Sequence, residues 1–225
     1  SSIGPAWNSP AMSAGREAAP PLLYLFGLPG AGKNHCGELL AREFGYTFRD
    51  GDDWLPDDLR ASLQRSQGFT PEQRDRYAAA ICRRISEERR AATATAAAML
   101  GARVRPLAVA QATFKRRHRD IIRDAHPDVV FVWVQTDDHA RFQRLRAGGN
   151  LVDEELGARM ARDFEPPDAE EASTVVVVLN GATVDDAALL TQLRAIVDGR
   201  GSRLVALGPR MLASAAERPV ADQVA

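Results

Sequence analysis

The sequence predicts a three-layer α/β fold, with helices on both faces of a five-stranded parallel sheet. Three runs of strand length, 22–26, 129–134 and 174–179, are apolar throughout, which is typical of strands buried between two helical layers. Helical stretches separate these runs along most of the chain, and such alternation favours parallel strands joined by right-handed crossovers. Two weaker runs, 46–48 and 106–110, supply the remaining strands.

Helices are expected at 33–44, 70–100, 114–125, 138–147, 153–163 and 184–197. The second of these has the clearest beginning. Thr70, Pro71 and Gln73 are an N-cap residue, a first-turn proline and a capping-box partner. The folded domain is expected to span 21–199, between a disordered leader at 1–20 and a loosely ordered tail at 200–225. Residues 1–11, which precede Met12, are a candidate remnant of the expression vector.

Composition favours an ordinary reduced, cytoplasmic protein. The net charge is −1, and no apolar run is long enough to span a bilayer, so neither nucleic acid nor a membrane is expected as a partner. Cys36 and Cys82 lie far apart without a metal-binding pattern, and the four histidines have no ligand spacing and are expected at the surface or at helix ends. Only two lysines occur, Lys33 and Lys115.

The first strand leads directly into GLPGAGKN at 27–34, and a helix follows. Glycines let main-chain N–H groups curl around phosphates, the helix adds its positive end, and a lysine reaches the β and γ oxygens. The strict pattern has Ser or Thr after the lysine as a Mg²⁺ ligand, and this chain has Asn34, whose amide oxygen is a longer, neutral ligand. The candidate nucleotide-binding residues here are Gly27, Leu28, Pro29, Gly30, Ala31, Gly32, Lys33, Asn34 and His35.

A second cluster, DGDD at 50–53, follows the second strand. Ligands of open parallel sheets bind at the carboxyl ends of the strands, which would bring these carboxylates opposite the phosphate-binding loop. Phosphoryl transfer to an alcohol needs a carboxylate that accepts the hydroxyl proton, and often a second that holds magnesium. Asp52 suits the first role and Asp50 the second.

Several spaced motifs together resemble the gluconate kinases, relatives of the shikimate kinases: GLPGAGKN at 27–34, RDGDDWLP at 49–56, FKRRHRD at 114–120 and RLRA at 144–147. The likeness runs from about Leu22 to Pro167. It implies a P-loop, nucleoside-kinase-like fold with ATP and Mg²⁺ as cofactors and a short mobile lid carrying arginines. By this resemblance Lys33 would grip the phosphates, Asp52 would face the acceptor hydroxyl, and Arg144 or Arg146 would come from the lid. Lys115 and Arg119 match a basic stretch of the family, where a structural role is at least as plausible.

Departures from the family pattern bear on the acceptor. The family has histidine, asparagine and lysine where this chain has Leu55, Leu59 and Ser62, and its CSALK stretch reads QATFK at 111–115. Gluconate is therefore not the expected acceptor. A metabolite with more apolar surface fits Trp54, Leu55 and Leu59 better, and Arg60 and Arg74 could meet its carboxylate or phosphate.

The leading hypothesis is an ATP-dependent small-molecule kinase. One alternative is a nucleotide-binding regulatory protein without catalysis, suggested by Asn34 and by Gly148 and Leu151, which replace an arginine and a histidine of the family lid. Another is a kinase acting on a nucleotide or a nucleic-acid end, disfavoured because the arginines are interspersed with carboxylates. A homodimer remains an open alternative to a monomer.

Overall fold

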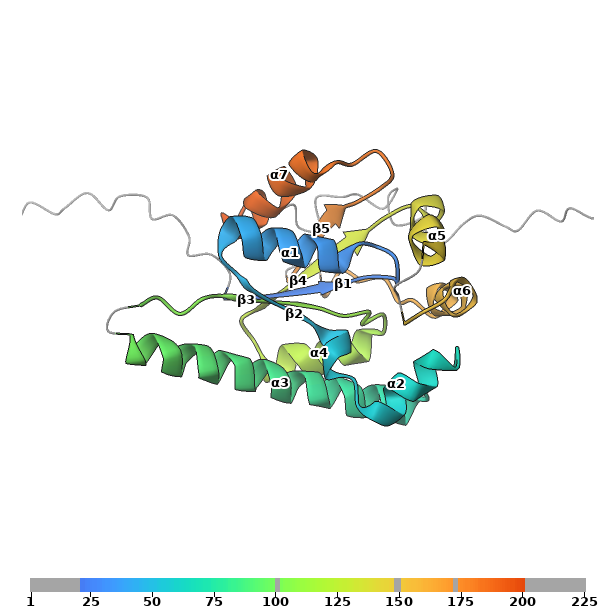
Figure 1. Cartoon of the computed structure of the whole chain (residues 1–225), viewed down its shortest axis with the longest axis horizontal. Helices are drawn as coiled ribbons and strands as arrows, with labels where there is room; N and C mark the ends of the chain where they lie inside the picture. Colours follow the sequence, from blue (N-terminus) through green and yellow to red (C-terminus); the bar gives the residue numbers. More distant parts are fainter. Residues whose placement is uncertain (1–20, 100–101, 148–150, 172–173, 201–225) are drawn as a thin grey trace, which may run out of the picture.

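The computed structural model describes residues 21–99, 102–147, 151–171 and 174–200 (Figure 1). The expected leader at 1–20, residues 201–225 of the expected tail and the lid positions 148–150 lie outside the described residues. No helix in the described part of the chain is both long and apolar enough to cross a lipid bilayer.

A five-stranded sheet, all parallel, forms the centre of the structure, in the order β2-β3-β1-β4-β5. Its strands are β1 (Leu22–Phe26), β2 (Thr47–Asp50), β3 (Leu107–Ala110), β4 (Val129–Gln135) and β5 (Val175–Leu179). The predicted fold class is therefore confirmed. The central strand β1 is buried along its whole length, whereas β2 at the edge is only partly buried.

The helices are α1 (Lys33–Phe44), α2 (Asp57–Gln64), α3 (Pro71–Ala98), α4 (Arg116–Ala125), α5 (Asp138–Arg146), α6 (Glu154–Arg162) and α7 (Asp186–Val197), with a 3₁₀ turn, η1 (Gly51–Trp54). Helices α1 and α7 cover one face of the sheet, and α3 and α4 cover the other (Figure 1). Each face has its own apolar core, and β1, β3, β4 and β5 contribute buried side chains to both, as their continuous apolar runs require.

The expected helices are all present within a few residues of their predicted ends. Thr70 caps α3 as predicted: its hydroxyl accepts from the Gln73 N–H, and the Gln73 side chain accepts from the Thr70 N–H. Two elements, η1 and α2, were not predicted. Helix α2 is eight residues long, so its apolar periodicity covers barely two turns, too little to be separated from a loop.

A buried ion pair fastens α4 to the segment before β5. The Arg119 guanidinium donates to both carboxylate oxygens of Glu171 at 2.7 and 2.6 Å, and the Arg119 and Glu171 side chains are 0% and 1% exposed. Arg119 also lies 5.2 Å from the Phe26 ring centroid, as in a cation–π contact. The basic stretch at 114–120 thus places Arg119 in the core, in a structural role.

We expect Glu171→Ala to lower the free energy of unfolding by about 3–5 kcal/mol, because it leaves the Arg119 charge buried without its partner. Denaturant unfolding followed by circular dichroism measures this. The matched control is Glu170→Ala, which removes the adjacent but exposed carboxylate that pairs with Arg116, and should change the unfolding midpoint little. Equal midpoints for the two variants would contradict the assigned role.

Candidate active site

The loop between β1 and α1 can be built only with glycine at three positions. Gly27, Gly30 and Gly32 have φ of 143°, 80° and 90°, a region that other residues rarely adopt. Space is as restrictive as conformation, because a Cβ on Gly27 would lie 2.5 Å from the Val134 carbonyl oxygen, and one on Gly32 would lie 2.1 Å from Asn180 Nδ2. The loop therefore packs directly against its neighbours.

Two side chains hold the outer side of this loop. Arg144 donates from Nη1 to the carbonyl oxygens of Gly30 and Ala31 at 3.2 and 3.3 Å, and from Nη2 to that of Asn180 at 3.1 Å. Asn180 in turn donates from Nδ2 to the Ala31 carbonyl oxygen at 2.8 Å. The loop is thereby fixed, and α1 begins from Gly32 without a side-chain cap. An uncapped helix start with its dipole directed at the loop favours an anion there.

Lys33 is the first residue of α1, and its Nζ donates to the Leu28 carbonyl oxygen across the loop at 3.0 Å. Burial lowers the pKa of the Lys33 ammonium from 10.5 to about 8, against the opposing effects of Asp52 and Asp50. An anion arriving in the loop would compensate this desolvated charge. The position suits a group that holds phosphate.

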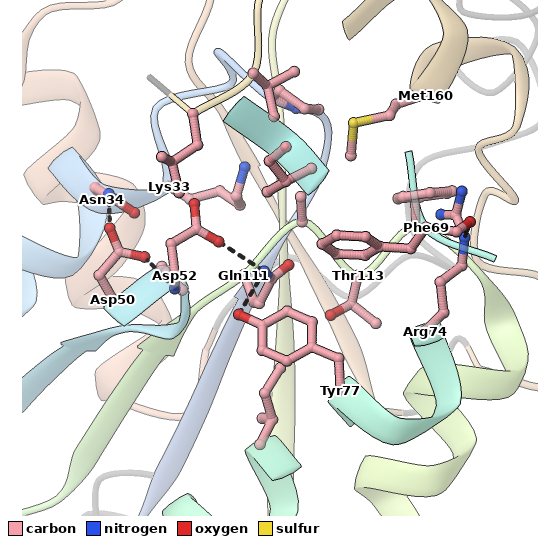
Figure 2. Close-up of a pocket in the computed structure, with 18 of the residues that line it drawn as sticks. Lys33, Asn34, Asp50, Asp52, Phe69, Arg74, Tyr77, Gln111, Thr113 and Met160 are labelled. Atoms are coloured by element: carbon pink, nitrogen blue, oxygen red, sulfur yellow. Dashed lines mark hydrogen bonds between the residues drawn. The ribbon is translucent and has the colours of Figure 1, made fainter. Parts of the chain in front are cut away.

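The DGDD cluster lies where β2 ends and η1 begins: Asp50 is the last residue of β2, and the next three residues belong to η1. Asp50 Oδ1 accepts from the Asp52 N–H at 2.9 Å and so caps η1. Asn34 Nδ2 donates to the other carboxylate oxygen of Asp50, which joins the cluster to the first turn of α1 (Figure 2). The phosphate-binding loop and the acidic cluster, 16 residues apart at Asn34 and Asp50, are thus brought into contact.

Asp52 is oriented by residues that sequence inspection did not single out. Gln111 Nε2 donates to Asp52 Oδ1 at 2.8 Å and to the Tyr77 hydroxyl oxygen at 3.0 Å (Figure 2). The Tyr77 hydroxyl in turn donates to the Gly51 carbonyl oxygen at 2.5 Å. Burial, followed by repulsion from Asp50, raises the pKa of Asp52 from 3.8 to about 6, although Lys33 and Arg60 oppose this. Gln111 directly follows β3 at the carboxyl edge of the sheet, and this position was the one signal that could have identified it.

These groups line one cavity of about 410 Å³. Lys33, Asp50 and Asp52 belong to its polar end, whereas Phe69, Tyr77 and Met160 are among the side chains of its apolar end (Figure 2). The structure brings ten of the predicted site residues to the cavity: Pro29, Gly30, Gly32, Lys33, Asn34, Asp50, Asp52, Arg60, Arg74 and Arg144.

The other predicted residues lie elsewhere. Gly27, Leu28 and Ala31 shape the loop from outside the cavity lining. His35 Nε2 lies 2.6 Å from a carboxylate oxygen of Asp186 on α7, and the exposed Arg146 forms two 2.6 Å hydrogen bonds with Glu154.

Three residues that were expected to make the acceptor pocket apolar do not line it. Leu55 and Leu59 are buried in the apolar core between the sheet and α3, and Trp54 packs against that core with the Arg84 guanidinium 5.8 Å from its ring centroid. That expectation was wrong, because η1 and α2 turn these side chains towards the core instead of the cavity.

Two of the histidines lie at the ends of α4, as one expected alternative, but are buried. His118, in the first turn, is 7% exposed, lines the cavity and lies 3.0 Å from an Asp75 carboxylate oxygen, and His126, the C-cap, is 5% exposed. No cluster of three or more His, Cys, Asp or Glu side chains suited to a metal occurs within the described ranges.

The fold and the site together define a P-loop kinase. The sheet is parallel with the order 2-3-1-4-5, a glycine loop with a lysine precedes an uncapped helix, and carboxylates lie across the cavity from this loop. Residues 19–148, more than half of the chain, match the family model of adenylylsulphate kinase. The chain belongs to this family of P-loop kinases.

Solved structures agree on the fold. A gluconokinase from Sinorhizobium meliloti is similar over 88% of this chain and 99% of its own, with 22% identity and a TM-score of 0.62. A sugar kinase from a Janibacter species, solved without ligand, is similar over 80% of this chain and 98% of its own, with 17% identity and a TM-score of 0.63. None of the curated proteins matches the chain significantly. The expected resemblance to the P-loop kinases is thus confirmed by the family model, and the likeness to a gluconokinase is confirmed at the level of the fold.

Proposed function

We propose that this protein is an ATP-dependent kinase that transfers the γ-phosphoryl group to a hydroxyl of a small metabolite. One observation carries the proposal: Lys33, in a phosphate-binding loop, and Asp52, a carboxylate with a raised pKa, line the same cavity. Burial opposes the charged form of both, and an environment of that kind is typical of groups with a chemical role.

In the proposed reaction, the acceptor hydroxyl oxygen forms a bond to the γ-phosphorus as the bond from that phosphorus to the bridging oxygen breaks, and ADP leaves with the electron pair. Asp52 takes the hydroxyl proton, and Gln111 holds the Asp52 carboxylate in place for it. Lys33 and the N–H groups of the loop stabilise the negative charge on the transferring phosphoryl group.

Mg²⁺ fits the donor set beside the loop. The Asp50 carboxylate and the Asn34 amide lie together at the polar end of the cavity, and oxygen ligands of these kinds are those that Mg²⁺ binds. When bound, the ion would neutralise phosphate charge during transfer. Asn34 and Asp50 would hold it.

A screen with MgATP tests the proposal. Candidate acceptors are sugar acids, polyols, cyclitols, hydroxy acids and adenylylsulphate, the last because of the family's name. Formation of ADP together with a product heavier by one phosphoryl group, detected by mass spectrometry, is the expected result. Gluconate itself is not the expected acceptor. If ATP binds and no acceptor is phosphorylated, the alternative of a non-catalytic nucleotide-binding regulatory protein replaces the proposal.

Asn34→Thr separates these two functions. Threonine supplies the hydroxyl that the usual loop carries after the lysine, so in a catalyst we expect kcat to be kept or raised and less Mg²⁺ to be required. The measurement is ADP release against Mg²⁺ concentration. A regulatory protein would bind nucleotide and transfer no phosphoryl group, with Asn34 or with threonine.

We expect kcat/KM for ATP to depend on pH with a bell shape. Asp52 must be ionised to accept a proton, so the rate falls as pH drops below the Asp52 pKa of about 6. Lys33 must be protonated to hold phosphate, so the rate also falls as pH rises above the Lys33 pKa of about 8. Steady-state rates between pH 5 and 9 measure both limbs. A flat profile over this range would contradict both assignments.

The proposal extends to the setting of the enzyme. We expect the enzyme to act in the cytoplasm. We expect small molecules and not nucleic acid as its partners, since the net charge is −1 and the arginines alternate with carboxylates. A homodimer is the alternative to a monomer that sedimentation equilibrium would test.

A further inference from the structure

We propose that the end of the cavity remote from the phosphate-binding loop is a subsite for the body of the acceptor, and that it selects an apolar, ring-sized hydroxy compound with one anionic group, which Arg74 binds. This inference rests on the proposed function and narrows it to an acceptor class. It concerns a part of the cavity that the loop and the acidic cluster do not use.

The walls of this subsite are mainly apolar and come from separate parts of the chain. The apolar side chains are Leu63 from α2, Phe69 from the loop before α3, Tyr77 and Ile81 from α3, Phe114 before α4, and Met160 from α6, and Thr113 and His118 are polar members of the lining. Phe69 packs edge-on against Tyr77 with ring centroids 6.2 Å apart, and both rings line the cavity. Such walls favour an apolar body and leave the hydroxyls of a sugar acid without partners.

Arg74 provides the one fixed positive charge among these walls. Its guanidinium carbon lies 4.4 Å from the Phe114 ring centroid, and its Nε donates to the Phe69 carbonyl oxygen at 3.1 Å (Figure 2). These two contacts fix the guanidinium at the cavity wall, and a guanidinium can donate two parallel hydrogen bonds to a carboxylate.

The outer nitrogens of Arg74 are poorly compensated. Within the part of the chain that the structure describes, their nearest carboxylate is that of Asp163, 3.9 Å away, beyond hydrogen-bond distance and 56% exposed. The Arg74 side chain is only 18% exposed, and burial lowers the pKa of its guanidinium. His118 also lines the cavity. It forms a hydrogen bond with Asp75 and has its pKa lowered by burial, so it adds no competing cation at neutral pH. Arg74 is therefore the group that would bind an anion.

The size of the cavity limits the body of the acceptor. The volume of about 410 Å³ includes the polar end with Lys33 and Asp52, so only part of it is available to the acceptor. A single ring or a branched chain is of a size for this part. The acceptor hydroxyl would reach Asp52 while its anionic group remains at Arg74.

Two acid and amide pairs test the subsite by binding alone: 4-(hydroxymethyl)benzoate with its benzamide, and 3-phenyllactate with its amide. Calorimetry in the presence of a non-hydrolysable ATP analogue measures dissociation constants. We expect at least one acid to bind roughly tenfold or more tightly than its amide, because a charged hydrogen bond is lost in the amide. That acid should also bind more tightly than gluconate and adenylylsulphate.

Arg74→Gln should abolish the preference for the acid over the amide. The matched control is Arg76→Gln, which removes an exposed arginine of the same helix that pairs with Asp58, and should keep the preference. Equal binding of acid and amide by the unmodified protein, no binding of either pair, or tighter binding of gluconate or adenylylsulphate would overturn the inference. If an acid binds as expected and no phosphoryl transfer follows with MgATP, the proposed function fails while the subsite stands.

Discussion

Replacing Lys33 by methionine should reduce kcat by about 10²–10³-fold, the loss typical of removing a preorganised group that stabilises developing charge. Methionine keeps the length of the side chain and removes its ammonium. Because burial already lowers the pKa of Lys33, its charge is unfavourable in the folded protein, and we expect the variant to fold with undiminished stability. ADP release with the acceptor identified by the screen measures the first effect, and thermal unfolding measures the second.

Lys115→Met is the matched control, since Lys115 is the other lysine of the chain and pairs with Glu165 outside the cavity. Its kcat should be close to that of the unmodified protein. Full turnover by Lys33→Met would refute the phosphate-binding role, and an equal loss in both variants would show that the effect does not come from the loop.

Replacing Asp52 by asparagine should reduce kcat by about 10²–10⁴-fold, the usual contribution of a positioned general base. Asparagine retains an oxygen that can accept the hydrogen bond from Gln111 Nε2, so the network with Tyr77 can persist while the proton acceptor is lost. The acid limb of the pH profile should disappear from the residual rate. Steady-state kinetics over the same pH range measures both effects.

The adjacent Asp53→Asn is the control for Asp52. Asp53 belongs to the same DGDD turn but is exposed, and we expect most of the activity to remain. A variant at Asp53 as damaged as that at Asp52 would contradict the specific role of the Asp52 carboxylate.

The same substitution at Asp52 should stabilise the protein. A carboxyl with a pKa raised from 3.8 to about 6 on folding disfavours the folded state, and the penalty develops as pH rises through this window and is complete above it. The asparagine side chain cannot ionise, so at pH 7.5 we expect a gain on the order of 2 kcal/mol, shrinking as pH falls towards 4. Thermal unfolding at several pH values measures the gain. Catalysis and stability therefore make opposite demands on this side chain.

The sequence alone determined the fold class and the polar end of the site. Four of the five strands are short apolar runs bounded by turn residues, and the glycines, lysine and following helix of the phosphate-binding loop are contiguous in sequence. Both features can therefore be predicted without knowing any distant contact. Lys33 and Asp52 were identified because each closely follows a predicted strand, and in a parallel sheet such positions lie at the carboxyl edge, where ligands bind.

Only the tertiary structure decided which other residues reach the cavity. Trp54, Leu55 and Leu59 follow the acidic cluster closely and were expected beside the acceptor, yet η1 and α2 turn them into the core. Gln111 and Asn180 were not identified, although they orient Asp52 and hold the loop from 59 and 149 residues away.

The physical reason is that a side chain's direction depends on the phase of short helical turns and on packing between layers. A window of a few residues determines neither of these. Such a window does determine the apolar run of a buried strand and the turn of a glycine loop.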